Sequence, residues 1–234
     1  MIDKWLHIEE LGGDLWVLPI WSSVNDALQK GKIKNLPAEV YELGVYISTR
    51  LNILPRIVKR INAEVTELFV VAEKHEEDNV FTKTEEGRAL RINNDLKYNI
   101  IGDIDSLLFE INSACELIKK LFESLYSHAG KPLNEKKVGL KFKSIIENAK
   151  QNPSWFSNLD QHRNFFIHNA TPYIAIDISS GPGNYELLIM KENLKDFKNK
   201  EKFITFFSLN EIVQGFLNSK PIIQDDLVNL FKAI

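Results

Sequence analysis

The chain is poor in residues that several common kinds of protein require. It has one cysteine in 234 residues, which excludes an internal disulfide and a cysteine-cluster zinc site and favours a reducing compartment. No uninterrupted apolar run approaches the ~20 residues of a membrane span. The first residues, MIDKWLHIEELGG, lack the basic and apolar regions of a secretory signal. We therefore expect a cytoplasmic protein that does not enter a membrane.

An excess of positive charge is also missing. Lysine and arginine number 29 against 32 acidic residues, for a net charge of -3, so a nucleic-acid partner would need a local basic patch. The 44% hydrophobic and 26% charged residues are typical of a globular protein. A chain of this length can bury one sizeable core, and we expect a single domain over residues 1–234.

Motifs for phosphate-binding loops and catalytic metals are missing too. The segment SGPGN at 180–184 falls in a predicted hairpin and lacks the lysine and helix of a phosphate loop. The five histidines do not form an HExxH pattern. We expect neither a cofactor nor a metal.

Apolar residues spaced by three and four positions predict two long helices. The first has its apolar stripe over 40–72 and is expected to start at Asn35 or Leu36, just before Pro37. Pro55 lies inside the stripe, which predicts a kink near residues 51–55. The second carries an unbroken stripe from Ile101 to Leu125. A polar stretch separates the two, which predicts an antiparallel pair.

The ends of the second helix are predicted from capping patterns. Thr82-x-x-Glu85 resembles a capping box at its start, and Gly130 follows its expected end at His128. Cys115 lies on the apolar stripe, which favours a buried, inert thiol.

The remaining chain predicts shorter elements. A helix over Leu11 to Leu28 is expected to be interrupted at Pro19, and further helices are expected over 134–150 and from Asn152-Pro153 to just before Thr171.

Three strands and a last helix are predicted near the C-terminus. The strands span 173–179, 185–190 and 203–207, and a capping box at Ser208-x-x-Glu211 opens a helix that is expected to break at Pro221. The prediction is a mainly α protein. It has a helical core over about 14–170, a small antiparallel sheet over about 172–207 and a C-terminal helix over about 208–234.

One short motif carries chemistry. Arg163, Asn164 and His168 form the pattern R-N-x-x-x-H near the end of a predicted helix. The pattern resembles the signature of the HEPN superfamily, whose members are largely helical bundles. The resemblance implies a bundle of long antiparallel helices and a metal-independent endoribonuclease that acts as a dimer with its motifs facing. It also implies a toxin or antiviral-defence setting, in which an antitoxin or regulatory protein is a partner.

The chemistry of these side chains fits RNA cleavage through the 2′-hydroxyl. Histidine exchanges protons near neutral pH, which suits His168 to general acid–base work. The planar guanidinium of Arg163 can stabilise charge on a phosphate, and Asn164 can orient the phosphate or His168. The helix dipole favours a cationic side chain at the position of His168.

Helix geometry separates Arg163 from His168. Residues five apart on a regular helix differ by about 140° in azimuth, whereas Asn164 and His168, four apart, share a face. A dimer in which two such helices face each other would supply the missing convergence.

A lysine-rich segment precedes the motif helix. Residues 131–150 contain six lysines and two glutamates, which would let them follow an RNA backbone with salt-sensitive affinity. The lysines predicted to bind RNA are Lys136, Lys137, Lys141 and Lys143.

Three alternatives remain open at this point. The fold can be a noncatalytic module that binds RNA or a protein. The protein can be purely structural, with Arg163 paired to a surface carboxylate and His168 capping its own helix. The lysines can form an ordinary solvated helix face.

Overall fold

The computed structural model describes residues 15–78, 81–84, 87–168, 173–190 and 203–234. A short 3-10 helix, η1 (Leu15–Val17), precedes six α-helices in this part of the chain. The α-helices are α1 (Leu18–Gln29), α2 (Ala38–Glu77), α3 (Asn94–His128), α4 (Glu135–Asn148), α5 (Ser154–His168) and α6 (Phe206–Lys232).

Two small antiparallel sheets accompany the helices. The strands are β1 (Thr82–Thr84), β2 (Gly87–Ala89), β3 (Tyr173–Asp177), β4 (Glu186–Met190) and β5 (Phe203–Thr205). β1 pairs with β2, and the second sheet has the order β3-β4-β5. The predicted mainly α fold with a small C-terminal sheet and a terminal helix is confirmed.

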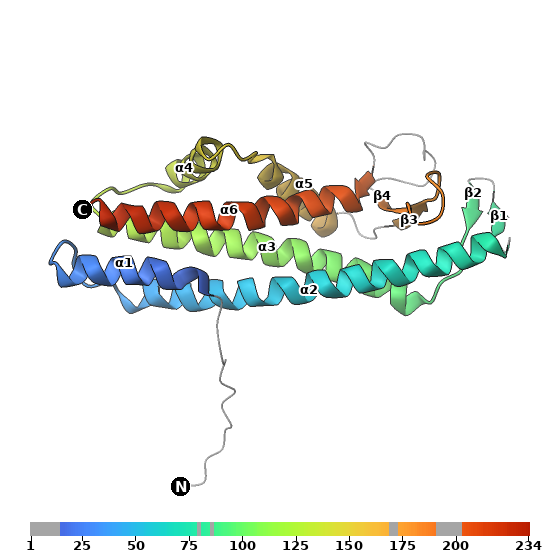
Figure 1. Cartoon of the computed structure of the whole chain (residues 1–234), viewed down its shortest axis with the longest axis horizontal. Coiled ribbons are helices and arrows are strands. Elements are labelled where there is room, and N and C mark those ends of the chain that lie inside the picture. Colours follow the sequence, from blue (N-terminus) through green and yellow to red (C-terminus); the bar gives the residue numbers. More distant parts are fainter. Residues whose placement is uncertain (1–14, 79–80, 85–86, 169–172, 191–202) are drawn as a thin grey trace, which may run out of the picture.

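α2 and α3 form the long antiparallel pair around which the rest of the bundle assembles (Figure 1). Their predicted apolar stripes are buried, with Ile47 and Ile104 both fully inaccessible to solvent. Two ion pairs bridge the helices beside this seam. Arg50 Nη1 lies 2.7 Å from Glu110 Oε1, and Arg60 Nε lies 2.7 Å from Asp103 Oδ2.

The predicted start of the second long helix was wrong. α3 begins at Asn94, and the Asn93 side chain accepts a hydrogen bond from the Asp95 backbone N–H at 2.9 Å. Thr82 instead pairs with Ala89 in the β1–β2 hairpin, because threonine suits a strand as well as a helix cap. The helix ends at His128 as predicted, and Gly130 has a positive φ of 74°.

The predicted breaks at Pro19 and Pro221 were also wrong. Pro19 lies in the first turn of α1, where no hydrogen bond is lost. α6 continues as a helix through Pro221, and α2 likewise continues through Pro55, where a kink was predicted. The rings of Pro55 and Pro221 are exposed, so the surrounding turns and the buried faces keep both helices continuous despite the missing N–H.

The C-terminal helix starts earlier than its predicted capping box. Thr205 caps α6 by accepting a hydrogen bond from the Ser208 backbone N–H at 3.0 Å. Asn152 caps α5 as predicted, accepting from the Ser154 N–H at 2.9 Å. The predicted boundaries at Leu11 and Thr171 lie outside the described residues.

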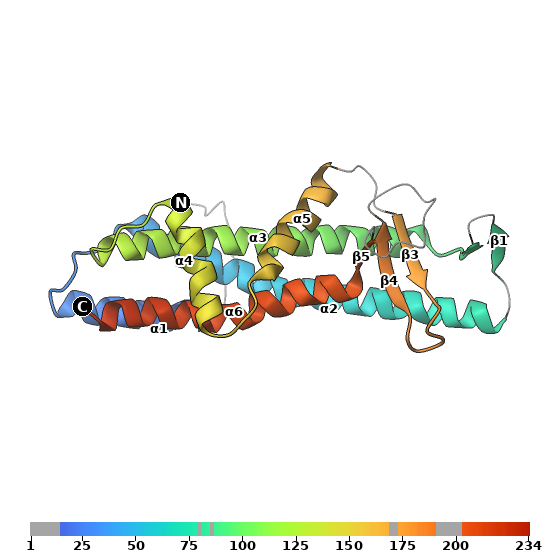
Figure 2. The same cartoon turned by 90° about the horizontal axis from the view of Figure 1, so that it is seen from above.

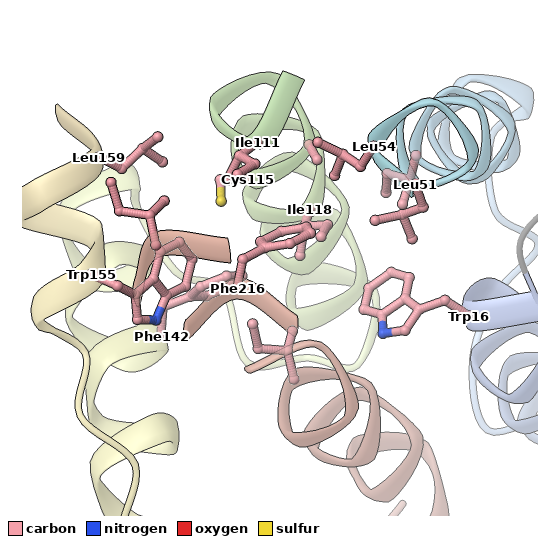
Figure 3. Packing of buried hydrophobic residues seen from close by; sticks show 14 of the residues in the cluster. Trp16, Leu51, Leu54, Ile111, Cys115, Ile118, Phe142, Trp155, Leu159 and Phe216 are labelled. Carbon is pink, nitrogen blue, oxygen red and sulfur yellow. The ribbon is translucent and has the colours of Figure 1, made fainter. Parts of the chain in front are cut away.

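Trp155 anchors α5 to α6. Its ring packs between the helices near Phe216 and is 3% exposed (Figure 3). A Cβ at Gly215 would lie 2.3 Å from Trp155 Cγ, so only glycine permits this approach. The indole N–H donates to Ser219 Oγ at 3.2 Å, which fixes the ring's orientation.

Cys115 lies in the core between α3 and α5 (Figure 3). Burial raises the pKa of its thiol to about 12, so the thiol stays protonated and unreactive at neutral pH. The prediction of a buried cysteine is confirmed. Within the described residues, no helix is long and apolar enough to cross a membrane.

Gly215→Ala tests the Trp155 contact. The new methyl group would clash with the base of the indole, and overpacking of this kind lowers the free energy of unfolding by about 1–3 kcal/mol. A Cβ at Gly139 on α4 would have no neighbour within 4 Å, so Gly139→Ala is the matched control. Urea denaturation should show the control unchanged or stabilised by up to about 1 kcal/mol. Equal stability of the two variants would contradict the contact.

Glu64 on α2 gives a pH-dependent prediction. Its Oε2 atom is buried without a hydrogen-bond partner. Loss of water raises the pKa of this carboxyl, as do the Asp103 and Glu67 carboxylates, while Arg60 opposes them. The native state therefore holds the proton to higher pH than the unfolded chain, so this contribution to stability is lost as pH rises through the native pKa.

Glu64→Gln removes the charge and keeps the shape. The variant should melt about 1–3 °C above the wild type at pH 7, and the difference should vanish below about pH 4, where the wild-type carboxyl is protonated. Thermal unfolding followed by circular dichroism measures both. A variant that melts below the wild type at pH 7 would refute the account.

Candidate functional site

α5 carries the R-N-x-x-x-H motif across the surface of α3 (Figure 2). Its N-terminal half is anchored in the core by Trp155 and Leu159, which are 3% and 1% exposed. Its last turn is different, because Ile167 and His168 are both exposed. The first half of α5 therefore fixes where the helix crosses α3. The second half, which carries the motif, lies at the surface.

A groove lies between α3 and the motif half of α5. It has a volume of about 230 Å³. Its lining residues are Asp105, Ser106, Phe109 and Glu110 from α3, with Arg163 and Ile167 from α5. The groove thus combines one motif residue with carboxylate, hydroxyl and apolar side chains.

Arg163 enters this groove without an ion pair to any described carboxylate. Its Nε atom is buried and has no hydrogen-bond partner. Glu110 is instead held by Arg50, whose Nη1 donates to both carboxylate oxygens at 2.7 and 2.9 Å. A buried guanidinium N–H that is left unsatisfied costs free energy, and no described carboxylate neutralises the charge of Arg163.

Asn164 and His168 lie outside the groove. Both are exposed, and neither lines the cavity beside Arg163. Among the described residues His168 does not cap its helix, whereas His128 does, with Nδ1 2.8 Å from the Ser124 carbonyl oxygen. One chain therefore presents Arg163 in one direction and the Asn164–His168 pair in another, as helix geometry predicts.

The predicted RNA-binding lysines lie on α4, apart from the groove. Lys136, Lys137 and Lys143 are exposed, but Lys141 Nζ lies 3.7 Å from Asp226 Oδ1 of α6. Three of the four lysines therefore form no ion pair with a described carboxylate. None of the four lines the groove with Arg163.

In the described part of the chain, neither His162 nor a metal-binding cluster adds to the groove. His162, next to Arg163, is 6% exposed, and its Nε2 lies 3.2 Å from Ser208 Oγ of α6. It therefore belongs to the packing between α5 and α6. No group of three His, Cys, Asp or Glu residues in the described ranges is arranged to hold a metal ion.

Sequence reasoning missed the α3 side of the groove. Glu110 is 9% exposed, and a carboxylate so deeply buried requires a cation nearby. Its position three residues after buried Leu107 was the available signal, because that spacing places it on the flank of the apolar face. Nothing in the sequence indicated that Arg50 of α2 would be its partner.

Comparison with known proteins finds no relative of this chain. No protein-family model, no curated protein and no solved structure matches the chain. The interpretation of the groove therefore depends on its own residues.

Substitution of Arg163, which lines the groove, and of Arg50, which pairs with Glu110, separates functional from structural roles. Arg50→Ala would leave Glu110 buried and unpaired, and should lower the free energy of unfolding by about 1–3 kcal/mol. Arg163→Ala removes no ion pair, and should change it by less than about 0.5 kcal/mol. Urea denaturation of both variants measures the difference. If Arg163→Ala is the more destabilising change, the motif arginine serves the fold.

Proposed function

We propose that the protein is a metal-independent endoribonuclease of HEPN type. The observation that carries the proposal is the state of Arg163, which lines a surface groove and forms no ion pair with a described carboxylate. Phosphate oxygens are strong acceptors for a guanidinium. The groove lies on the outside of the bundle, where an RNA strand can reach it.

The proposed reaction is a transfer at phosphorus. The 2′-hydroxyl oxygen of one nucleotide attacks the adjacent phosphorus, and the bond from phosphorus to the 5′ oxygen breaks. One proton leaves the 2′ oxygen and one is delivered to the departing 5′ oxygen, which leaves a 2′,3′-cyclic phosphate. Arg163 stabilises the extra charge on the phosphate, His168 transfers protons, and Asn164 orients the phosphate or His168.

We propose a homodimer with facing motifs as the active form. A single chain does not bring its own Arg163 and His168 to one phosphate, because only Arg163 lines the groove. Arg163 and His168 also point in different directions on α5. Phe109 and Ile167, which flank Arg163, are 52% and 54% exposed, so a second copy would cover apolar surface there.

The biological setting is proposed from the resemblance alone. HEPN-type ribonucleases occur in toxin and defence systems, and this chain would act in the cytoplasm under the control of an antitoxin or another regulatory protein.

A second candidate is a noncatalytic module that binds RNA or a protein. Asp105 and Glu110 line the groove beside Arg163, and their carboxylates reduce the positive potential that a phosphate meets there. A lower potential stabilises the charge of a cleavage transition state less, which favours a noncatalytic role.

RNA cleavage in the presence of EDTA tests the leading proposal. The pure protein should cut a mixed single-stranded and structured RNA, and the products should end in a 2′,3′-cyclic phosphate. Arg163→Ala and His168→Ala should each lower the rate by at least about 100-fold, because each removes an interaction with the transition state.

The matched control is Lys59→Ala, which replaces an exposed cation of α2 and should leave the rate unchanged. Circular dichroism checks that each variant is folded. Absence of cleavage by the wild type, with RNA affinity intact in both motif variants, would favour the noncatalytic candidate.

A further inference from the structure

Two exposed tyrosines enclose a lysine at the N-terminal end of α3. Lys97 Nζ lies 5.4 Å from the ring centre of Tyr98 and 5.9 Å from that of Tyr173. Tyr98 is 59% exposed and Tyr173 is 44% exposed. We call these three residues the tyrosine–lysine cluster. Large aromatic rings that remain this exposed add little to the core and are available to a ligand.

The cluster joins parts of the chain that are distant in sequence. Tyr98 and Lys97 belong to α3, whereas Tyr173 is the first residue of β3. The β3–β4 hairpin is itself tied to α2, since the Gly183 N–H donates to Glu73 Oε1 at 2.7 Å. The Tyr185 hydroxyl donates to Glu76 of the same helix. The small sheet therefore holds Tyr173 in a fixed place beside α3.

The cluster lies on the same face of α3 as the groove. Tyr98, Gly102, Asp105 and Phe109 follow the spacing of one helical stripe. Gly102 carries no side chain, and nothing lies within 4 Å of the place a Cβ would occupy. Tyr98 and Phe109 are separated by about 16 Å along the helix axis, and the surface between the two rings is open at Gly102.

Covalent connection also places the cluster close to His168. Tyr173 follows His168 by five residues, so their Cα atoms are at most about 17 Å apart whatever path the chain takes. The cluster and the motif are therefore separated by the length of a few nucleotides.

We propose that the tyrosine–lysine cluster binds single-stranded RNA and directs it along α3 towards Arg163. Bases stack on the rings of Tyr98 and Tyr173, and Lys97 contacts a phosphate. Single-stranded RNA fits this site because each base offers a face to stack, whereas paired bases are already stacked on one another. The direction of the strand rests on the proposed function of the groove, but binding at the cluster does not.

Asp105 gives the proposed path a testable electrostatic feature. Its carboxylate lies on the stripe between Tyr98 and Phe109 and would repel a nearby phosphate. Replacement by asparagine should therefore tighten RNA binding, the opposite direction to loss of a ring.

The experiment measures binding of a fluorescently labelled single-stranded 2′-O-methyl RNA, which cannot be cleaved through its 2′ oxygen. Fluorescence anisotropy should show that Tyr98→Ala and Tyr173→Ala each weaken binding about tenfold, the loss expected for one base stack. Tyr98→Trp and Tyr173→Trp should restore it. Tyr46→Ala, which removes a 51% exposed tyrosine from α2, is the matched control.

Two charge variants complete the test. Lys97→Gln should lower the slope of log Kd against log salt by about 0.7, the value for one phosphate contact on a single strand. Asp105→Asn should tighten binding about two- to threefold at low salt, because one exposed charge contributes modestly.

The outcomes separate this proposal from the proposed function. Loss of affinity in both tyrosine variants, rescue by tryptophan and an unchanged Tyr46→Ala control would support the cluster even if the protein cuts no RNA. Unchanged affinity in the tyrosine variants would overturn it even if the protein is an active ribonuclease. Equal loss in Tyr46→Ala, tighter binding of a matched duplex, or no affinity in the wild type would also overturn it.

Discussion

The contact between Trp155 and Gly215 decides where α5 crosses the bundle, and the candidate site depends on that position. The indole sits against α6 at a distance that admits no Cβ, and its N–H is held by Ser219. With the first half of α5 fixed in this way, the second half passes over α3 with Arg163 facing Asp105, Phe109 and Glu110. A shift of α5 by one turn would carry the arginine about 5 Å along the helix axis and out of register with these residues.

The long helices could be predicted from sequence because their signal is repeated many times. The buried stripes of α2 and α3 each extend over about nine turns, and a single proline such as Pro55 cannot outweigh the burial of such a face. The ends of a helix, in contrast, depend on only one or two residues. The capping pattern at Thr82 was matched by chance, since the same threonine pairs with Ala89 in a strand, while Asn93 caps the helix.

The candidate site was predicted in part. The motif residues and their divergence follow from spacing along one helix, and the exposed positions of Asn164 and His168 agree with that spacing. The groove depends on which faces of α3 and α5 meet, and no local pattern specifies that. The same holds for the Arg50–Glu110 pair, whose members are 60 residues apart, and for the meeting of Tyr173 with Lys97. The α4 lysines show the reverse case, in which a local charge pattern does not indicate where the charges will lie.

The two carboxylates near Arg163 have different effects. Glu110 fixes Arg50 and so strengthens the α2–α3 seam, and Asp105 keeps the groove from being strongly cationic, in agreement with the net charge of -3 for the chain. Such a groove would hold a phosphate weakly unless other contacts bring the strand to it. Base stacking at the tyrosine–lysine cluster supplies contacts of that kind, because stacking does not depend on net positive charge. In this account the sheet that carries Tyr173 takes part in substrate binding, and α5 carries the chemistry.

The central claim is that two copies of α5 together form one reactive site, and mixing two inactive variants tests it most directly. Arg163→Ala and His168→Ala proteins would be unfolded together, refolded as a mixture and assayed for RNA cleavage in EDTA. If a site takes Arg163 from one copy and His168 from the other, half of the dimers are mixed and each has one intact site of two. Activity should then return to about a quarter of the wild-type value. No activity in a mixture that forms dimers would contradict the account, because it would mean that Arg163 and His168 of the same chain must act together.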